Sequence, residues 1–247
     1  LLGWPLPLSA EARALLGPAT RNLPSLGRLA GRGSTMSAET LLQLKPDLVL
    51  DAGGADATYL SGMQQVAQQT GLPCLLIHGR LAEHPAQLRE VGRLLGVAER
   101  GERLAAHADA ILALAARLRD SLSADKRPRV YLGRGADGLE TGLDGSINME
   151  VIDCCGGRNV AAAAGKGGIT KVSLEQLLAW NPEVIVTQDR DFARHALTHP
   201  LWRPLAAVRA GRVHCAPKLP FGWLDGPPGV NRLVGVEMLG SFGLEVQ

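Results

Sequence analysis

The sequence contains no run of eighteen apolar residues, so no segment is predicted to span a membrane. It also has no long basic run, and its formal charge is only +2, so nucleic acid is not an expected partner. Hydrophobic residues make up 46% of the 247 positions and charged residues 20%, which is ample material for a core. These features indicate a globular protein of one or two compact units.

Signatures of catalysis are also missing. There is no G-x-S-x-G elbow and no assignable Cys/His pair. The segment AGKGGIT at 164–170 lacks the upstream glycine of a phosphate-binding loop, and Gly167 stands where Ser or Thr should follow the lysine. His195 and His199 have the i,i+4 spacing of a zinc pair, but Pro200 follows and no H-E-x-x-H glutamate is present, so a turn is expected.

The cysteines have no metal-site spacing, and their redox state stays open. A bridge between the two adjacent ones would strain the backbone. The four are Cys74, Cys154, Cys155 and Cys215. We therefore expect no catalytic residue, no bound metal and no resident cofactor.

One fifteen-residue sequence pattern occurs twice. Residues 37–51 read SAETLLQLKPDLVLD and residues 173–187 read SLEQLLAWNPEVIVT, 136 positions apart (175 − 39). Each copy predicts a short helix capped by serine and stopped near proline, followed by a buried strand. The glutamates Glu39 and Glu175 fall in the first helical turn, where the helix dipole favours a carboxylate. The repeat indicates two similar lobes, although two unrelated αβ units could share such phrasing.

Strands and helices alternate along the chain. DLVLDAG at 47–53 and PCLLIHG at 73–79 are predicted strands with a helix near 57–70 between them, which is a βαβ unit and implies a parallel sheet. Helices are predicted at 84–96 and at about 99–123, the second long enough to connect two lobes. Further strands follow at 129–133, 183–187 and 212–217, and a closing helix at 229–242.

The predicted fold is therefore α/β, with two αβ lobes that contain parallel sheets, a single long rigid helix joining them and a ligand cleft between them. We assign residues 1–98 to the first lobe, 99–124 to the helix and 125–247 to the second lobe.

This order of segments resembles the class of periplasmic binding proteins that serve ABC importers of iron–siderophore complexes, haem and cobalamin. The resemblance is carried by the two repeats, by VIDCCGGRNVAA at 151–162 and by HPLWRPLAAVRAGRVHCAP at 199–217. It implies a monomer that binds a small-molecule metal complex, in the periplasm or on a lipid anchor outside the membrane. The family usually begins with a further strand and helix, so we expect the chain to be a trimmed product that lacks them.

The resemblance also implies a role for the repeated glutamates. In the family they lie on the outer tips of the lobes and dock onto arginines of the membrane permease. Glu39 and Glu175 match those positions. Two exposed carboxylates at a fixed separation suit cationic pockets; the alternative is that both merely complement helix dipoles.

Candidate ligand residues follow the ends of the predicted strands, because ligands of open parallel sheets bind beyond the carboxyl ends. The arginines suit an anionic ligand, since a guanidinium binds oxygens bidentately. Trp223 offers a flat apolar face, although each of these side chains could equally be structural. The predicted set is Arg32, Tyr59, Arg80, Arg134, Glu140, Trp223, Asp225 and Arg232.

A ferric siderophore is the ligand we expect first and a small oxyanion such as molybdate the second. Haem-binding relatives usually carry a tyrosine before the first repeated glutamate, and LGRLAGRGSTM has none, so haem is disfavoured although Tyr59 could ligate iron. Cobalamin is bulky and largely neutral, which fits the arginines poorly. An enzyme on a similar two-lobed scaffold, for which the adjacent cysteines are the sole hint, and a sensor module are the competing classes.

Overall fold

The computed structural model of this chain describes residues 1–29, 35–53, 57–226 and 229–241. They form two compact units, Leu1–Gly79 and Arg80–Gln247, each an assembly of helices on a parallel sheet. The helix expected at 84–96 belongs to the second unit, so the unit boundary lies before the one predicted at residue 98. None of the described helices is long and apolar enough to cross a membrane.

The first unit contains the predicted βαβ motif. Strands β1 (Val49–Gly53) and β2 (Cys74–His78) are parallel, with Val49 opposite Cys74, and helix α4 (Ala57–Thr70) connects them. Three further helices precede the motif: α1 (Ala10–Ala14), α2 (Pro18–Arg21) and α3 (Ala38–Gln43). A small core forms where Leu41, Val49 and Met63 are buried together.

The second unit begins with η1 (Leu81–Glu83) and two packed helices, α5 (His84–Leu94) and α6 (Ala98–Ser121). The helices approach closely at a pair of glycines: a Cβ on Gly92 would lie 2.8 Å from the Cα of Gly101, so only glycine fits. The face of α6 that packs on the unit is built from small residues and one isoleucine, with Ala108, Ile111 and Ala115 buried.

A four-stranded parallel sheet forms the centre of the second unit, in the order β5-β3-β7-β8. Strands β3 (Arg129–Gly133), β7 (Val184–Thr187) and β8 (Val213–Cys215) confirm the three strands predicted there. The short edge strand β5 (Arg158–Asn159) was not predicted.

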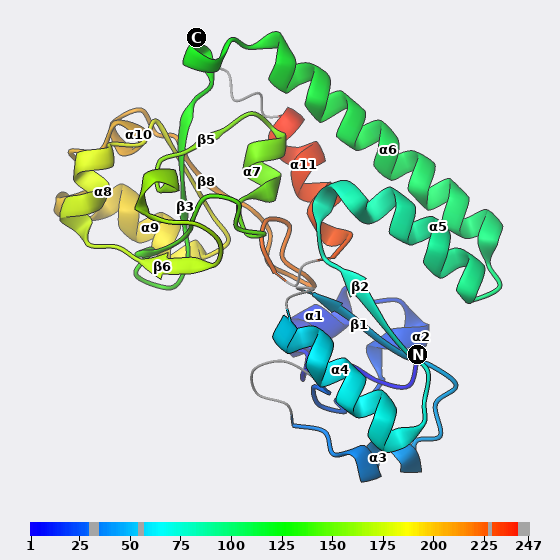
Figure 1. The fold of residues 1–247 in the computed structure, drawn as a ribbon. Coiled ribbons are helices and arrows are strands. Elements are labelled where there is room, and N and C mark those ends of the chain that lie inside the picture. The colour runs from blue at the N-terminus through cyan, green and yellow to red at the C-terminus, as the bar shows by residue number, and fades with distance from the viewer. Residues whose placement is uncertain (30–34, 54–56, 227–228, 242–247) are drawn as a thin grey trace. The chain divides into compact units, whose positions relative to one another are not determined.

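Alternate strand residues point to opposite faces of this sheet, which gives three layers. Val130 and Leu132 of β3 pack with α6, α7 (Glu150–Cys154) and α11 (Asn231–Ser241). Tyr131 of β3 packs on the other face, with α8 (Leu174–Trp180), α9 (Arg190–Thr198) and α10 (Ala206–Arg209). Figure 1 shows α8, α9 and α10 on one side of the strands and α6, α7 and α11 on the other.

A small two-stranded antiparallel sheet lies beside the central sheet and was not predicted. It pairs β4 (Glu140–Gly142) with β6 (Ile169–Lys171), and the segment 164–170 leads into β6. Gly167 and Gly168 have φ values of 64° and 66°, so the glycines of AGKGGIT serve a tight turn. The remaining short helices are η2 (Ala124–Lys126), η3 (Ala162–Ala164) and η4 (Pro200–Trp202).

The two copies of the repeated phrase have the same local structure. Ser37 and Ser173 cap their helices, each accepting a hydrogen bond from the backbone N–H three residues on. The residue before each proline, Lys45 or Asn181, is left-handed, with φ of 47° and 45°. The fourth helical position is buried in both copies, as Leu41 and Leu177.

Candidate functional site

Both repeated glutamates lie in the first turn of their helices and are exposed, Glu39 on α3 and Glu175 on α8. The Glu175 carboxylate accepts hydrogen bonds from its own backbone N–H and from the Ser173 hydroxyl, which lowers its pKa below the ordinary value. Glu175 is therefore charged at neutral pH and open to a partner. Docking on a permease stays a prediction.

Three predicted ligand residues meet in one cluster at the carboxyl edge of the second unit's sheet. Arg134 follows β3, and its Nε donates to Oδ2 of Asp225. Its Nη1 lies 3.6 Å from Oε2 of Glu140. Gln188, which follows β7, donates from Nε2 to Oδ1 of Asp225 at 2.6 Å and accepts from the backbone of Leu224 at 2.8 Å. Gln188 was not predicted.

The charge balance of this cluster disfavours an anionic ligand, because Arg134 is already paired with carboxylates of the cluster. One guanidinium faces two carboxylates, so the cluster carries a net charge of −1. The Arg134 side chain is only 25% exposed. An anion that approached Arg134 would have to compete with Asp225, which is itself buried.

A second cluster has the opposite charge balance. Glu150, in the first turn of α7, accepts from Arg80 Nη1 at 2.9 Å and from the backbone N–H of Leu81 at 2.8 Å. It also accepts from Arg232 Nη1 at 3.1 Å, and the same nitrogen donates to the carbonyl of Ile147 at 2.8 Å. Two guanidinium groups thus share one carboxylate.

The two arginines of this cluster differ in exposure. The Arg232 side chain is 0% exposed, and its burial lowers its pKa while Glu150 opposes that shift. This argues against the ligand contact predicted for Arg232, because no part of its side chain reaches the surface. The Arg80 side chain is 47% exposed and remains a ligand candidate. Nearby His84 is buried, which lowers its pKa, so it is neutral at pH 7.

The other predicted ligand residues are scattered. Tyr59 packs half-buried against the small core of the first unit. Trp223 is half-buried in the loop before α11. A Cβ on Gly235 would lie 1.9 Å from the carbonyl oxygen of Trp223, so α11 packs directly against the Trp223 backbone. Arg32 lies outside the described residues.

A shallow pocket of about 550 Å³ opens elsewhere on the second unit and contains none of the predicted ligand residues. His195 and Trp202 line it with the carboxylates of Asp137 and Asp191. The rings of His195 and His199 stack at 4.6 Å, and within the described ranges no three His, Cys, Asp or Glu side chains gather as a metal site.

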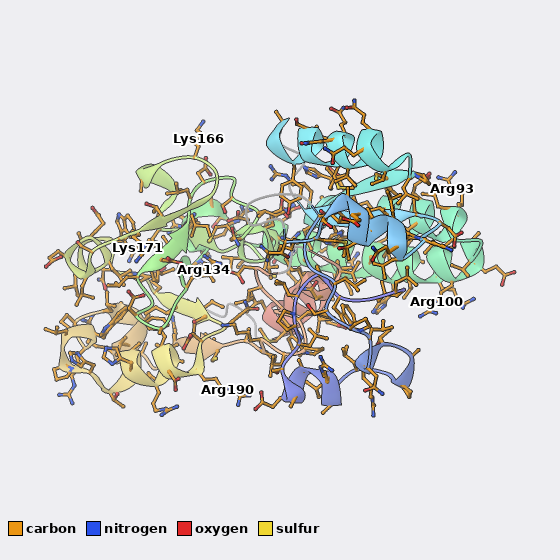
Figure 2. All side chains as sticks on the ribbon, turned by 90° about the horizontal axis from the view of Figure 1, so that it is seen from below. Arg93, Arg100, Arg134, Lys166, Lys171 and Arg190 are labelled. Carbon is orange, nitrogen blue, oxygen red and sulfur yellow. The ribbon has the colours of Figure 1, made fainter. Side chains whose placement is uncertain are left out.

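Exposed cations also lie around the second unit. Figure 2 labels Arg134 together with Lys166, Lys171 and Arg190, the last three exposed. Exposed carboxylates such as Asp144 and Glu175 also lie in this part of the chain. The surface of the second unit therefore has no uniform charge. Whether an arginine can bind an anion depends on the charges next to it rather than on the net charge of the chain.

The sequence model of the periplasmic binding protein family matches residues 21–219, which is most of the chain. This chain belongs to the periplasmic binding protein family. Its helical backbone and parallel sheets match solved members: an ABC transporter solute binding protein from Sulfurospirillum deleyianum superposes with a TM-score of 0.88 at 27% identity, over 98% of this chain and 76% of that one.

Two relatives with known ligands are also similar. The molybdate-binding protein MolA of Haemophilus influenzae is 29% identical over 84% of this chain, and its molybdate-bound structure superposes with a TM-score of 0.72 at 25% identity, over 95% of this chain and 77% of that one. A vitamin B12-binding protein of Salmonella typhi is 31% identical over 61% of the chain. The chain spans only 63% and 54% of the length of these two proteins.

Proposed function

We propose that this chain is the substrate-binding component of an ABC importer, that it acts in the periplasm or on a lipid anchor facing it, and that its ligand is a small metal oxyanion of the molybdate type. Family membership supports the binding role. The oxyanion is supported by the similarity to MolA, which extends over 84% of this chain, against 61% for the vitamin B12-binding protein.

The observation that carries the choice of ligand is the charge of the Arg80 cluster. Arg80 lies two residues after the last residue of β2, beyond the carboxyl end, where ligands of open sheets bind. Its cluster holds two guanidinium groups and one carboxylate, and Arg80 is the member that reaches solvent. A compact oxyanion matches one exposed guanidinium better than a bulky neutral ligand does.

The ferric siderophore expected first from the sequence is placed second here. A large anionic chelate would be bound best by several ligand-facing arginines, whereas Arg134 is compensated by carboxylates and Arg232 is buried. The siderophore stays a prediction that the same experiment tests.

A titration of the chain against a ligand panel tests the proposal. Calorimetry and native mass spectrometry would compare molybdate, tungstate, sulfate, a ferric hydroxamate, haemin and cobalamin in one buffer. We expect saturable 1:1 binding of molybdate and tungstate. Binding of cobalamin, haemin or the ferric hydroxamate with no response to either oxyanion would reject the oxyanion and leave the binding role.

The docking role needs a separate measurement. We expect Glu39→Ala plus Glu175→Ala to reduce uptake in cells or in proteoliposomes that carry the cognate permease, because both carboxylates are exposed and Glu175 is charged. Ligand affinity should stay unchanged. Glu99→Ala is the matched control, since Glu99 is an exposed glutamate in the first turn of α6. Equal uptake by the double variant and by Glu99→Ala would contradict permease docking through this pair.

A further inference from the structure

We propose that Glu150 is a positioning residue of the anion site: it holds Arg80 in a fixed orientation for the ligand, while the buried Arg232 offsets the negative charge that Glu150 brings. This inference rests on the proposed function, because it assumes that Arg80 contacts the anion.

The geometry around Glu150 fixes residues 80 and 81 at two points. Oε1 accepts from the Arg80 side chain at 2.9 Å, and Oε2 accepts from the Leu81 backbone at 2.8 Å. An unrestrained arginine loses about 2 kcal/mol of rotamer entropy when a ligand orders it. A guanidinium that is already held loses less, so ordering before binding increases affinity.

The contact with Glu150 leaves most of the Arg80 guanidinium available. In the described part of the chain, Arg80 donates a side-chain hydrogen bond only from Nη1, and only to Glu150. A guanidinium has five N–H donors in a planar fork. The remaining donors can form a bidentate pair with two oxygens of a tetrahedral or planar oxyanion.

Arg232 explains how a carboxylate can sit in an anion site without repelling the ligand. Arg232 is fully buried and donates to Glu150 at 3.1 Å, so its charge offsets that of the carboxylate. His84, which packs nearby, is neutral. Asp225 also acts on Arg232, but its oxygens are bonded to Arg134 and Gln188. The Arg80–Glu150–Arg232 cluster therefore keeps a net charge of +1, which one anion would balance.

Positioning of Arg80 and electrostatic attraction predict opposite effects of one substitution on the affinity for the anion. Glu150→Gln removes a negative charge, so attraction alone predicts tighter anion binding. Loss of positioning predicts weaker binding, by about tenfold if one charge-assisted hydrogen bond is lost. The double variant Glu150→Gln/Arg232→Met restores the net charge of +1 and removes the buried guanidinium together with its carboxylate, so it tests positioning alone and protects against a variant that does not fold.

The experiment measures molybdate affinity by calorimetry for wild type, Arg80→Ala, Glu150→Gln, the Glu150→Gln/Arg232→Met variant and Glu150→Gln/Arg80→Ala. We expect Glu150→Gln and Glu150→Gln/Arg232→Met each to bind molybdate about tenfold more weakly than wild type. The Glu150→Gln/Arg80→Ala variant should bind no worse than Arg80→Ala, because Glu150 acts through Arg80. Glu102→Gln, which breaks an exposed pair with Arg89, is the matched control and should bind as wild type.

Wild-type affinity in Glu150→Gln/Arg232→Met, or additive losses in the variant lacking both Glu150 and Arg80, would overturn the inference and leave the proposed function intact. If wild type binds no anion, the proposed oxyanion ligand fails instead. A ligand-free readout then decides the positioning role: ¹⁵N NMR of the Arg80 guanidinium should show restricted rotation in wild type and free rotation in Glu150→Gln. Equal mobility in both would contradict it.

Discussion

Replacement of Glu150 by glutamine should destabilise the second unit strongly. Glu150 is the only carboxylate that forms an ion pair with Arg232 among the described residues, and the Arg232 side chain is 0% exposed. Glutamine has nearly the same shape and keeps one acceptor, which can still bind the Leu81 N–H that now donates to Oε2. The substitution therefore removes charge without opening a cavity.

The magnitude follows from the two arginines separately. Leaving a buried charge without its partner costs about 3–5 kcal/mol. The Arg80 pair is half-exposed, so its loss adds only about 0–1 kcal/mol. Because the amide oxygen still accepts one hydrogen bond, we expect a loss near the lower limit, about 3 kcal/mol. A domain with about 5–15 kcal/mol of stability would remain folded.

Urea unfolding followed by circular dichroism and tryptophan fluorescence measures this loss. Glu102→Gln is the control, because its pair with Arg89 is exposed to solvent and its loss should leave the free energy of unfolding close to that of wild type. Glu150→Gln/Arg232→Met should recover most of the stability, because replacing a buried ion pair by uncharged groups often leaves the free energy of unfolding unchanged. A free energy of unfolding for Glu150→Gln within 1 kcal/mol of wild type would refute the buried-charge argument.

Two further predictions concern single side chains. Ser173→Ala should lower the unfolding free energy by about 1 kcal/mol in urea, because the hydroxyl caps the backbone of Gln176, whereas Ser173→Asp should keep most of it. Asp153 is exposed as a residue, but desolvation of its carboxyl group, and then the nearby carboxylates of Asp144 and Glu150, raise its pKa to about 6. Its unfolded pKa is about 3.9. The folded state therefore favours the protonated acid. At pH values above 6, Asp153→Asn should unfold at a higher urea concentration than wild type. This difference should largely disappear as the pH falls toward 4, where Asp153 is protonated in the folded state and partly protonated in the unfolded state. An equal gain at pH 7.5 and pH 4 would contradict this.

Much of the fold follows from local patterns. The repeated phrase predicts a cap, a short helix and a buried strand at both positions, because serine, the apolar spacing and proline each act within a few residues. Capping by Ser37 and Ser173 confirms this. The small β4–β6 sheet was missed because its strands have three residues each and show no periodicity. Their partners lie about thirty positions apart, which no local signal reveals.

The candidate site was less predictable. Reading strand ends located Arg134, Glu140 and Asp225, which the structure brings together. It could not show that the two carboxylates neutralise the arginine, since charge balance depends on contacts 91 residues apart. Glu150 was missed because its partners are 70 and 82 residues away. The first turn of a short helix was the available signal, and it does not distinguish a dipole partner from a buried counter-ion.

The most direct test of the account is an anomalous difference map at the molybdenum edge, from crystals of wild-type chain grown with equimolar molybdate. The account predicts one strong peak per chain, with oxygens at hydrogen-bonding distance from the Arg80 guanidinium. A peak that lies away from Arg80, or an ordered Arg80 with no molybdenum beside it, would contradict the claim that this arginine receives the ligand.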